Sequence, residues 1–295
     1  MDEDVTADIV GDEKPVLITS SLLGPPPYVL DPSDLSEAFQ PIKSKGGLRQ
    51  IDEHTLVKYG GAVTLAEAEA MDFVARNTDI KVPKVIGAYE LNGTAYIIMS
   101  FEEGRPLWDF WKDASLEEKE TVIGHLQKCL TQMRSLKGDY VGGFNRSPCT
   151  SDEFQWDMDT SGSYKYGPYA DEHAFNEGLL EAYARAHPGQ LSTDLESSEY
   201  NRMYATRQLV HSLRDHEIVF THGDLNASNI LVQHDLTVVI LDWNSAGYFP
   251  AYWEWYKATW HGVFKPSFIR QVERYIPPYW MEANIMLQIH AKILG

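Results

Sequence analysis

The sequence has 295 residues, of which 43% are hydrophobic and 23% are charged. This composition is typical of a folded globular protein and excludes a wholly disordered or fibrous chain. The formal net charge of -18 argues against a nucleic-acid partner, because contact with a phosphate backbone requires clustered Lys and Arg.

Two cysteines are too few for a disulfide framework, and the chain begins with acidic residues rather than with a basic stretch followed by an apolar run. A reducing, cytoplasmic location is therefore expected. No apolar run approaches the ~20 residues that span a bilayer, so no membrane partner is expected.

Residues 1–40 contain nine acidic residues against one basic residue, and they include the run Pro25-Pro26-Pro27. Proline cannot continue a helix and removes a hydrogen-bond donor from a sheet. We therefore expect residues 1–40 to form an acidic arm that is mobile or loosely docked.

Residues 41–101 are predicted to form a small antiparallel sheet with one helix. Thr64 and Glu67 have the spacing of a capping box, in which a hydroxyl and a carboxylate satisfy the first amides of a helix, so a helix is expected to run to about Arg76. The expected strands cover residues 48–51, 55–59, 85–90 and 95–101.

Residues 102–295 are predicted to be mainly helical. Ser115 and Glu118 have the spacing of a second capping box, and the apolar residues between Val122 and Met133 fall on one helix face. Further helices are expected near residues 172–185, 197–213, 251–263 and 279–294, and one strand at 218–221.

The most informative stretch lies between Thr221 and Asp242. Two apolar runs, 230–233 and 237–241, flank a three-residue turn and predict an antiparallel hairpin. Asn229 immediately precedes the first strand and Asp242 immediately follows the second, so their side chains are expected at the same end of the hairpin. A carboxylate and an amide oxygen, completed by water and phosphate, suit a hard cation such as magnesium.

Two further residues of this stretch have an expected role. Asp224, five residues before Asn229, is placed to accept a proton nearby. His222 stands next to a glycine at a strand end, where a histidine is more often a hydrogen-bonded brace than a proton carrier, and we predict that it is a brace.

The segment 221–229, together with residues 241–243, resembles the catalytic and metal-binding loops of the aminoglycoside phosphotransferase and choline kinase-like family, and other features resemble its fungal-type branch. That family has the protein-kinase fold, and the resemblance covers most of residues 40–295. It implies an α+β, protein-kinase-like two-lobe fold: a small antiparallel-sheet N-lobe with one helix (41–101) that binds nucleotide, and a larger, mainly helical C-lobe (102–295) that carries catalysis and substrate binding.

The resemblance implies that Asp224 is the catalytic base and that Asn229 and Asp242 are the Mg2+ ligands. It implies that Lys58 holds the phosphates of ATP and that a glutamate on the next helix pairs with it. Glu67 and Glu69 are both candidates. We favour Glu69, because Glu67 is expected to cap the helix and Glu69 fits the family spacing better.

The same resemblance predicts the remaining nucleotide contacts. Gly46 and Gly47 correspond to the loop that covers the phosphates, although this segment is not a clean Gly-x-Gly-x-x-Gly. Met99 would contact the adenine, and the backbone from Ser100 to Glu102 would bind its edge. A structural residue is also implied: Glu254 resembles the family's helix acid that braces the catalytic loop.

These residues predict an ATP-dependent small-molecule kinase that transfers the γ-phosphate to a hydroxyl group. The segment 141–200, with eleven acidic residues against three basic ones, is the expected substrate-binding insert. Its charge either attracts a cationic metabolite or antibiotic or only solubilises the chain.

The alternative function is a non-catalytic pseudokinase that acts as a scaffold or regulator. A protein kinase is less expected, since only ten residues separate Asp242 from Trp253. The oligomeric state is left open.

Overall fold

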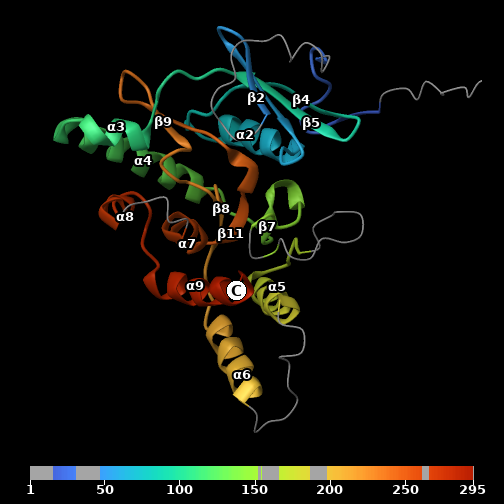
Figure 1. The fold of residues 1–295 in the computed structure, drawn as a ribbon, viewed down its shortest axis with the longest axis vertical. Helices are drawn as coiled ribbons and strands as arrows, with labels where there is room; N and C mark the ends of the chain where they lie inside the picture. Colours follow the sequence, from blue (N-terminus) through green and yellow to red (C-terminus); the bar gives the residue numbers. More distant parts are fainter. Residues whose placement is uncertain are drawn as a thin grey trace, which may run out of the picture.

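The computed structural model describes residues 16–30, 47–151, 154, 166–186, 198–260 and 266–294. Figure 1 shows β2, β4, β5 and α2 together in the upper part of the molecule and α5, α6 and α9 in the lower part. The predicted α+β, two-lobed fold is confirmed. Of the predicted segments, residues 1–15 and 31–46 lie outside the described residues, as do 152–153, 155–165 and 187–197 of the proposed substrate-binding insert.

The N-lobe is a five-stranded antiparallel sheet covered on one face by a helix. Its strands are β1 (Leu17–Thr19), β2 (Gly47–Asp52), β3 (Thr55–Gly60), β4 (Val85–Leu91) and β5 (Thr94–Ser100), in the order β1-β4-β5-β3-β2. Met71 and Val74 of helix α2 (Leu65–Asn77) belong to the same buried core as Ile97 of the sheet. Residues of the opposite parity, such as Tyr89 and Ile98, form a smaller apolar cluster on the other face.

The C-lobe is mainly helical and contains two small three-stranded sheets. The sheets have the orders β10-β9-β6 and β7-β11-β8. Their strands are β6 (Arg105–Pro106), β7 (Gly142–Gly143), β8 (Ile218–Thr221), β9 (Ile230–Val232), β10 (Val238–Ile240) and β11 (Gly247–Pro250). The helices are α3 (Leu107–Asp113), α4 (Leu116–Ser135), α5 (Glu172–Ala186), α6 (Ser198–His211), α7 (Trp253–Trp260), α8 (Pro266–Val272) and α9 (Trp280–Leu294). Within the described parts of the chain, we find no helix with the length and apolar character needed to cross a membrane.

The strands and helices predicted from apolar patterns are present within a few residues of their expected bounds. The strands and α-helices that the sequence did not predict are β1, β6, β7, β11, α3 and α8. Most of these are two to four residues long, and such short strands are defined by the partner with which they pair rather than by a repeating pattern. Residues 17–19, expected in a loose arm, pair with β4 at the edge of the sheet.

The two predicted capping boxes have different outcomes. At the start of α4, Ser115 Oγ accepts from the Glu118 amide and the Glu118 carboxylate accepts from the Ser115 amide, so this box is confirmed. At the start of α2, the predicted box is wrong. The Thr64 hydroxyl makes no cap hydrogen bond and donates instead to Asn244 Oδ1 at 3.0 Å. Tertiary partners therefore replace the local motif at this helix start.

We expect Ser115→Ala to lower the free energy of unfolding by about 1 kcal/mol, because the mutation removes an acceptor for an amide at the start of α4. Urea denaturation of the two proteins measures this difference. Ser115→Gly is the control and should cost only a few tenths of a kcal/mol, because glycine at this position leaves the amide open to water. An unchanged stability of Ser115→Ala would contradict the contribution of the cap.

A histidine links α5 to α9 at the base of β8. Nδ1 of His216 lies 2.7 Å from Glu172 Oε1, and its Nε2 lies 3.5 Å from Glu282 Oε1. The hydrogen bond to Glu172 raises the pKa of His216 above its ordinary value, although partial burial opposes this shift. Because the folded-state pKa exceeds the unfolded-state pKa of about 6.5, these contacts stabilise the fold fully below that pH and are lost as the pH rises through the folded-state value.

We therefore expect His216→Gln to lower the melting temperature more at about pH 6 than at about pH 9. Thermal unfolding followed by circular dichroism measures both shifts. His234→Gln is a matched control, because His234 is exposed in the turn between β9 and β10. An equal loss for His216→Gln at the two pH values would show that its charge does not contribute.

Candidate active site

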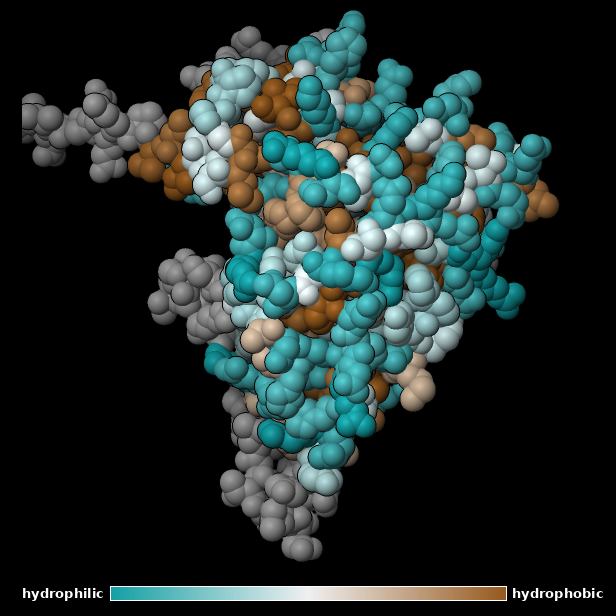
Figure 2. Space-filling view, turned by 180° about the vertical axis from the view of Figure 1, so that it is seen from behind, coloured by the Kyte–Doolittle hydropathy of each residue, from teal (hydrophilic) through white to brown (hydrophobic). Residues whose placement is uncertain are grey.

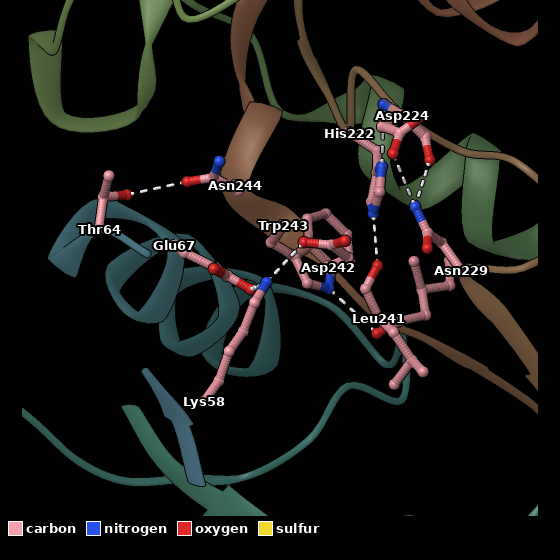
Figure 3. Close-up of polar contacts among 11 residues, drawn as sticks. Lys58, Thr64, Glu67, His222, Asp224, Asn229, Leu241, Asp242, Trp243 and Asn244 are labelled. Carbon is pink, nitrogen blue, oxygen red and sulfur yellow. Dashed lines mark hydrogen bonds and ion pairs between the residues drawn. The ribbon is translucent and has the colours of Figure 1, made fainter. Parts of the chain in front are cut away.

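The hairpin of β9 and β10 brings the two predicted metal ligands to one end. The two strands pair in register from Ile230 with Ile240 to Val232 with Val238. Just beyond them, the Leu241 amide donates to the Asn229 carbonyl at 2.8 Å. Asp242 follows Leu241 directly, and Figure 3 shows Asn229 and Asp242 on either side of Leu241. The expected placement of these residues at the same end of the hairpin is what the structure shows.

Asp224 faces Asn229 across the preceding loop. Nδ2 of Asn229 donates both to the Asp224 carbonyl and to Asp224 Oδ2, at 2.9 Å each. Asn226 Nδ2 donates to the other carboxylate oxygen at 3.0 Å. Because the amide nitrogen of Asn229 is bound to Asp224, its amide oxygen is the atom that remains for a cation. The arrangement therefore orients Asn229 as an oxygen ligand.

The buried ring of His222 holds the loop that carries Asp224 through hydrogen bonds. The fully buried ring of His222 accepts from the Asp224 amide at Nδ1 and donates to the Leu241 carbonyl at Nε2, at 3.1 and 2.8 Å. Because a backbone amide can only donate and a carbonyl can only accept, the proton lies on Nε2. His222 thus links the loop of Asp224 to the loop of Asp242, which is the contact expected of a brace.

Glu254 at the start of α7 supports the same loop from the other side. Its Oε2 accepts from the amides of His222 at 2.7 Å and Gly223 at 3.5 Å. Its side chain is buried, and burial raises the pKa of Glu254 above its ordinary value. The sequence resemblance placed Glu254 at this position, and its bonds to two consecutive amides of the loop suit a bracing role.

Gly223 shows why the loop requires glycine at this point. Its φ is +79°, a left-handed conformation, and a Cβ built there would lie 2.5 Å from the Ser245 carbonyl oxygen. Any side chain would both strain the backbone and separate this loop from the 3-10 helix η3 (Trp243–Ser245). The sequence therefore permits the two loops to approach closely.

Lys58 of β3 joins the two lobes. Its Nζ lies 2.7 Å from Glu67 Oε1 of α2 and 2.7 Å from Asp242 Oδ1 of the C-lobe, as Figure 3 shows. Burial lowers the pKa of Lys58, but the two carboxylates outweigh it, so the net pKa lies above its ordinary value. Burial raises the pKa of Glu67 to about 6, because its side chain is only 1% exposed against 20% for Lys58. The stronger desolvation of Glu67 explains why its pKa rises although it faces a cation.

The predicted pairing of Lys58 with Glu69 is wrong, because Glu67 is the partner. The choice of Glu69 rested on the family spacing and on a capping role for Glu67, and the structure does not contain that cap. Glu69 is buried elsewhere: Ser20 Oγ donates to its Oε1 at 2.6 Å, and Asn145 Nδ2 donates to its Oε2 at 3.3 Å. Sequence spacing alone could not separate the two glutamates, since both lie in the first turns of α2.

The remaining predicted nucleotide residues lie at the two ends of the N-lobe sheet and in the connector that follows it. Met99 is 5% exposed at the end of β5, and Ser100 Oγ donates to Glu102 Oε1 at 2.6 Å in the connector. Gly47 begins β2 opposite Tyr59, while Gly46 lies outside the described residues. Contacts of these residues with adenine and phosphate remain predictions.

The donor set fits a hard divalent cation. Among the residues that the structure describes, no group of three His, Cys, Asp or Glu side chains is close enough to hold a metal by itself. Asp242 and the amide oxygen of Asn229 would offer two oxygen ligands to such a cation, and phosphate and water would complete the coordination in the manner that Mg2+ prefers. Asp242 also has a φ of +61°, a strained backbone for a residue with a side chain and typical of functional positions.

The fold and the site define a kinase-like phosphotransferase. A family model described as the phosphotransferase enzyme family matches residues 62–279, more than half of the chain, and the chain belongs to this family. No curated protein matches the chain.

Solved structures share the fold at low sequence identity. The ADP-bound aminoglycoside phosphotransferase APH(2'')-Ib has a TM-score of 0.56 and 15% identity, covering 90% of this chain and 91% of that chain. The streptomycin-ATP ternary complex of APH(2'')-IIa has a TM-score of 0.55 and 14% identity, covering 89% and 88%. APH(3'')-Id from Streptomyces rimosus ATCC10970 has a TM-score of 0.51 and 16% identity, covering 86% and 92%.

We expect Glu67→Gln to weaken nucleotide binding by about tenfold, because it removes the buried carboxylate that orients Lys58. The dissociation constant of ATP in the presence of Mg2+, measured by isothermal titration calorimetry, gives the size of the effect. Lys58→Met should weaken binding at least as much. Circular dichroism checks that the variants are folded, and a dissociation constant equal to that of the wild type for Glu67→Gln would refute this role of the pair.

Proposed function

We propose that this protein is an ATP-dependent kinase that transfers the γ-phosphate to a hydroxyl group of a small molecule. The observation that carries the proposal is the meeting of four polar side chains at one end of the β9–β10 hairpin, beneath the N-lobe sheet: Lys58, Asp224, Asn229 and Asp242. Their chemistry is a cation for phosphate, a pair of oxygen ligands for a divalent metal, and a carboxylate next to them.

The geometry supports a direct transfer between two bound substrates. The oxygen of the acceptor hydroxyl bonds to the γ-phosphorus of ATP, and Asp224 accepts the proton of that hydroxyl. The bond between the γ-phosphorus and the bridging oxygen breaks, and ADP leaves. Lys58 holds the α- and β-phosphates, oriented by Glu67. Asn229 and Asp242 would hold Mg2+, which supplies positive charge to the phosphate oxygens when it is bound. Catalysis of this type depends on positioning and on charge stabilisation.

The rigid support of the loop suits this role for Asp224. Its carboxylate is oriented by two amide donors, and its backbone is held through His222 and Glu254. A group that is positioned in advance does not have to reorganise when the reaction begins. The same intact set of residues is the reason to favour an enzyme over a pseudokinase.

For the acceptor, we propose a hydroxylated small molecule and favour one that carries an amine. The streptomycin complex among the structural neighbours and the net charge of -18 support a cationic substrate. The acidic segment 141–200 remains the proposed place of binding. We also propose a cytoplasmic setting, because two cysteines in 295 residues are too few for the disulfide framework that is typical of small secreted proteins.

We expect Asp224→Asn to lower kcat by about 10²- to 10⁴-fold, because an amide cannot accept the hydroxyl proton. The assay combines ATP, Mg2+ and a panel of amino alcohols and detects phosphorylated products by mass spectrometry. The control is Asp215→Asn, because Asp215 is exposed and has a φ of +67°, which asparagine tolerates well.

Thermal shift with ATP and Mg2+ separates binding from catalysis. The wild type and Asp224→Asn should both be stabilised by the nucleotide, since the mutation leaves Lys58 and Asp242 in place. Binding without a phosphorylated product across the panel and a cell metabolite extract would favour the pseudokinase. Full turnover by Asp224→Asn would overturn the catalytic assignment.

A further inference from the structure

Residues 16–30, named here the N-terminal strap, wrap around the β4 edge of the N-lobe sheet. Residues 17–19 pair with β4, and Leu23 then packs against the core on the α2 side of the sheet. Leu30 packs against the apolar cluster on the opposite face, where its amide donates to the Tyr89 hydroxyl at 2.8 Å. Between these points, the chain passes so close to β4 that a Cβ at Gly87 would lie 2.9 Å from Pro26 Cβ.

Most of the large apolar side chains of the strap are exposed. Figure 2 shows apolar surface at the upper left, on the side of the molecule where the strap lies. The exposed large apolar residues of the strap are Val16, Leu17, Ile18, Leu22, Tyr28 and Val29. Ser20, in contrast, is 4% exposed and is the single buried residue of the strap. The most deeply buried side chain of the strap is therefore a hydroxyl, whereas Leu23 and Leu30 pack against the apolar clusters and are only partly buried.

Ser20 completes a junction of three segments, in which Ser20 and Glu69 are buried and Asn145 lies at the surface. Its Oγ accepts from the amides of Leu22 and Leu23 at 3.1 and 3.2 Å, and it donates to Glu69 Oε1 at 2.6 Å. The other oxygen of Glu69 accepts from Asn145 Nδ2 of the 3-10 helix η1 (Phe144–Arg146) in the C-lobe. One carboxylate on α2 thus binds the strap on one side and the C-lobe on the other.

The C-lobe part of this junction has a strained backbone. Asn145 and Arg146 have φ values of +54° and +58°, a left-handed conformation that asparagine tolerates but that arginine rarely adopts. The Arg146 amide is held by the Tyr140 hydroxyl at 3.1 Å. Strain of this kind persists where the surrounding structure imposes it, and it clusters at functional positions. Here it directs the Asn145 side chain to Glu69.

The junction and the ion pair of Lys58 hold different sides of one helix. Residues two apart on an α-helix are rotated by about 200°, so Glu67 and Glu69 point away from each other. Lys58 holds Glu67 while Ser20 and Asn145 hold Glu69, and Thr64 ties the start of α2 to Asn244. Apolar contacts alone allow a helix to turn by small amounts, whereas these directional bonds specify its rotation.

We propose that Ser20 and Asn145 are positioning residues for the nucleotide site: through Glu69 they hold α2 in the rotation that places Glu67 on Lys58. The N-terminal strap is therefore a working part of the site, although it lies on the far side of α2 from Lys58. This inference rests on the proposed function, in which Lys58 binds the phosphates of ATP.

The test compares Ser20→Ala with Ser21→Ala, because Ser21 is the exposed neighbour in the same strap. We expect Ser20→Ala to raise the dissociation constant of ATP with Mg2+, measured by isothermal titration, about five- to twentyfold. In the kinase assay, KM for ATP should rise by a similar factor, with kcat within about threefold of the wild type, and Ser21→Ala should match the wild type. Asn145→Gly allows the positive φ and removes the side-chain amide that donates to Glu69, so it should raise the dissociation constant in the same way from the other lobe.

A double mutant separates positioning from general loss of stability. If Ser20 acts through Glu67, adding Ser20→Ala to Glu67→Gln should change the dissociation constant by less than about twofold, because the contact that it supports is already gone. Full additivity of the two changes, or equal binding by Ser20→Ala and Ser21→Ala, would overturn the inference and leave the proposed function intact. If the wild type binds no nucleotide, both proposals fall together.

Discussion

The ion pair of Lys58 with Glu67 and Asp242 is the contact on which the arrangement of the two lobes depends. One ammonium from the N-lobe sheet lies 2.7 Å from a carboxylate on α2 and 2.7 Å from another in the C-lobe. Glu67 is almost completely buried, and a buried charge is tolerated only where a partner of opposite charge is fixed nearby. Moving α2 away from β3 would leave the buried Glu67 carboxylate without its partner, and the free-energy cost of that keeps the two elements in one relative position.

Rigid support surrounds this contact on the C-lobe side. The loop of Asp224, the hairpin end at Asn229 and the loop of Asp242 are joined by hydrogen bonds through the buried His222 ring and the Leu241 backbone. Glu254 also belongs to this arrangement, because its carboxylate accepts from the His222 amide. Four segments between residues 222 and 254 thus share one network, in which the loss of a member leaves buried partners unsatisfied.

The two glutamates of α2 show how closely position and role are related in this fold. They differ by two residues, and both are buried, but one faces the nucleotide side and the other faces the N-terminal strap and η1. The same helix is therefore in contact with the sheet, the strap and the C-lobe. Its role as a connecting element explains why its first two turns contain two buried glutamates where an ordinary buried helix contains apolar residues.

Much of this protein was determined by local sequence. Regular apolar patterns predicted the long strands and helices, and residues next to strand ends predicted the site, because a hairpin necessarily brings the residues before and after it together. The hairpin explains why the sequence correctly predicts that Asn229 and Asp242 lie at the same end. The spacing of Ser115 and Glu118 in the same way correctly predicts the cap of α4. These features depend on residues close in sequence or on one simple pairing.

The tertiary structure alone decided which glutamate binds Lys58, where the Thr64 hydroxyl donates and how residues 16–30 dock. Each of these depends on a tertiary partner: Lys58 on the neighbouring strand for the glutamate, and Asn244 and Glu69, which are distant in sequence, for Thr64 and the strap. A side chain that has several possible partners takes the one that desolvation and distance favour once the lobes have packed, and no spacing in the sequence contains that information.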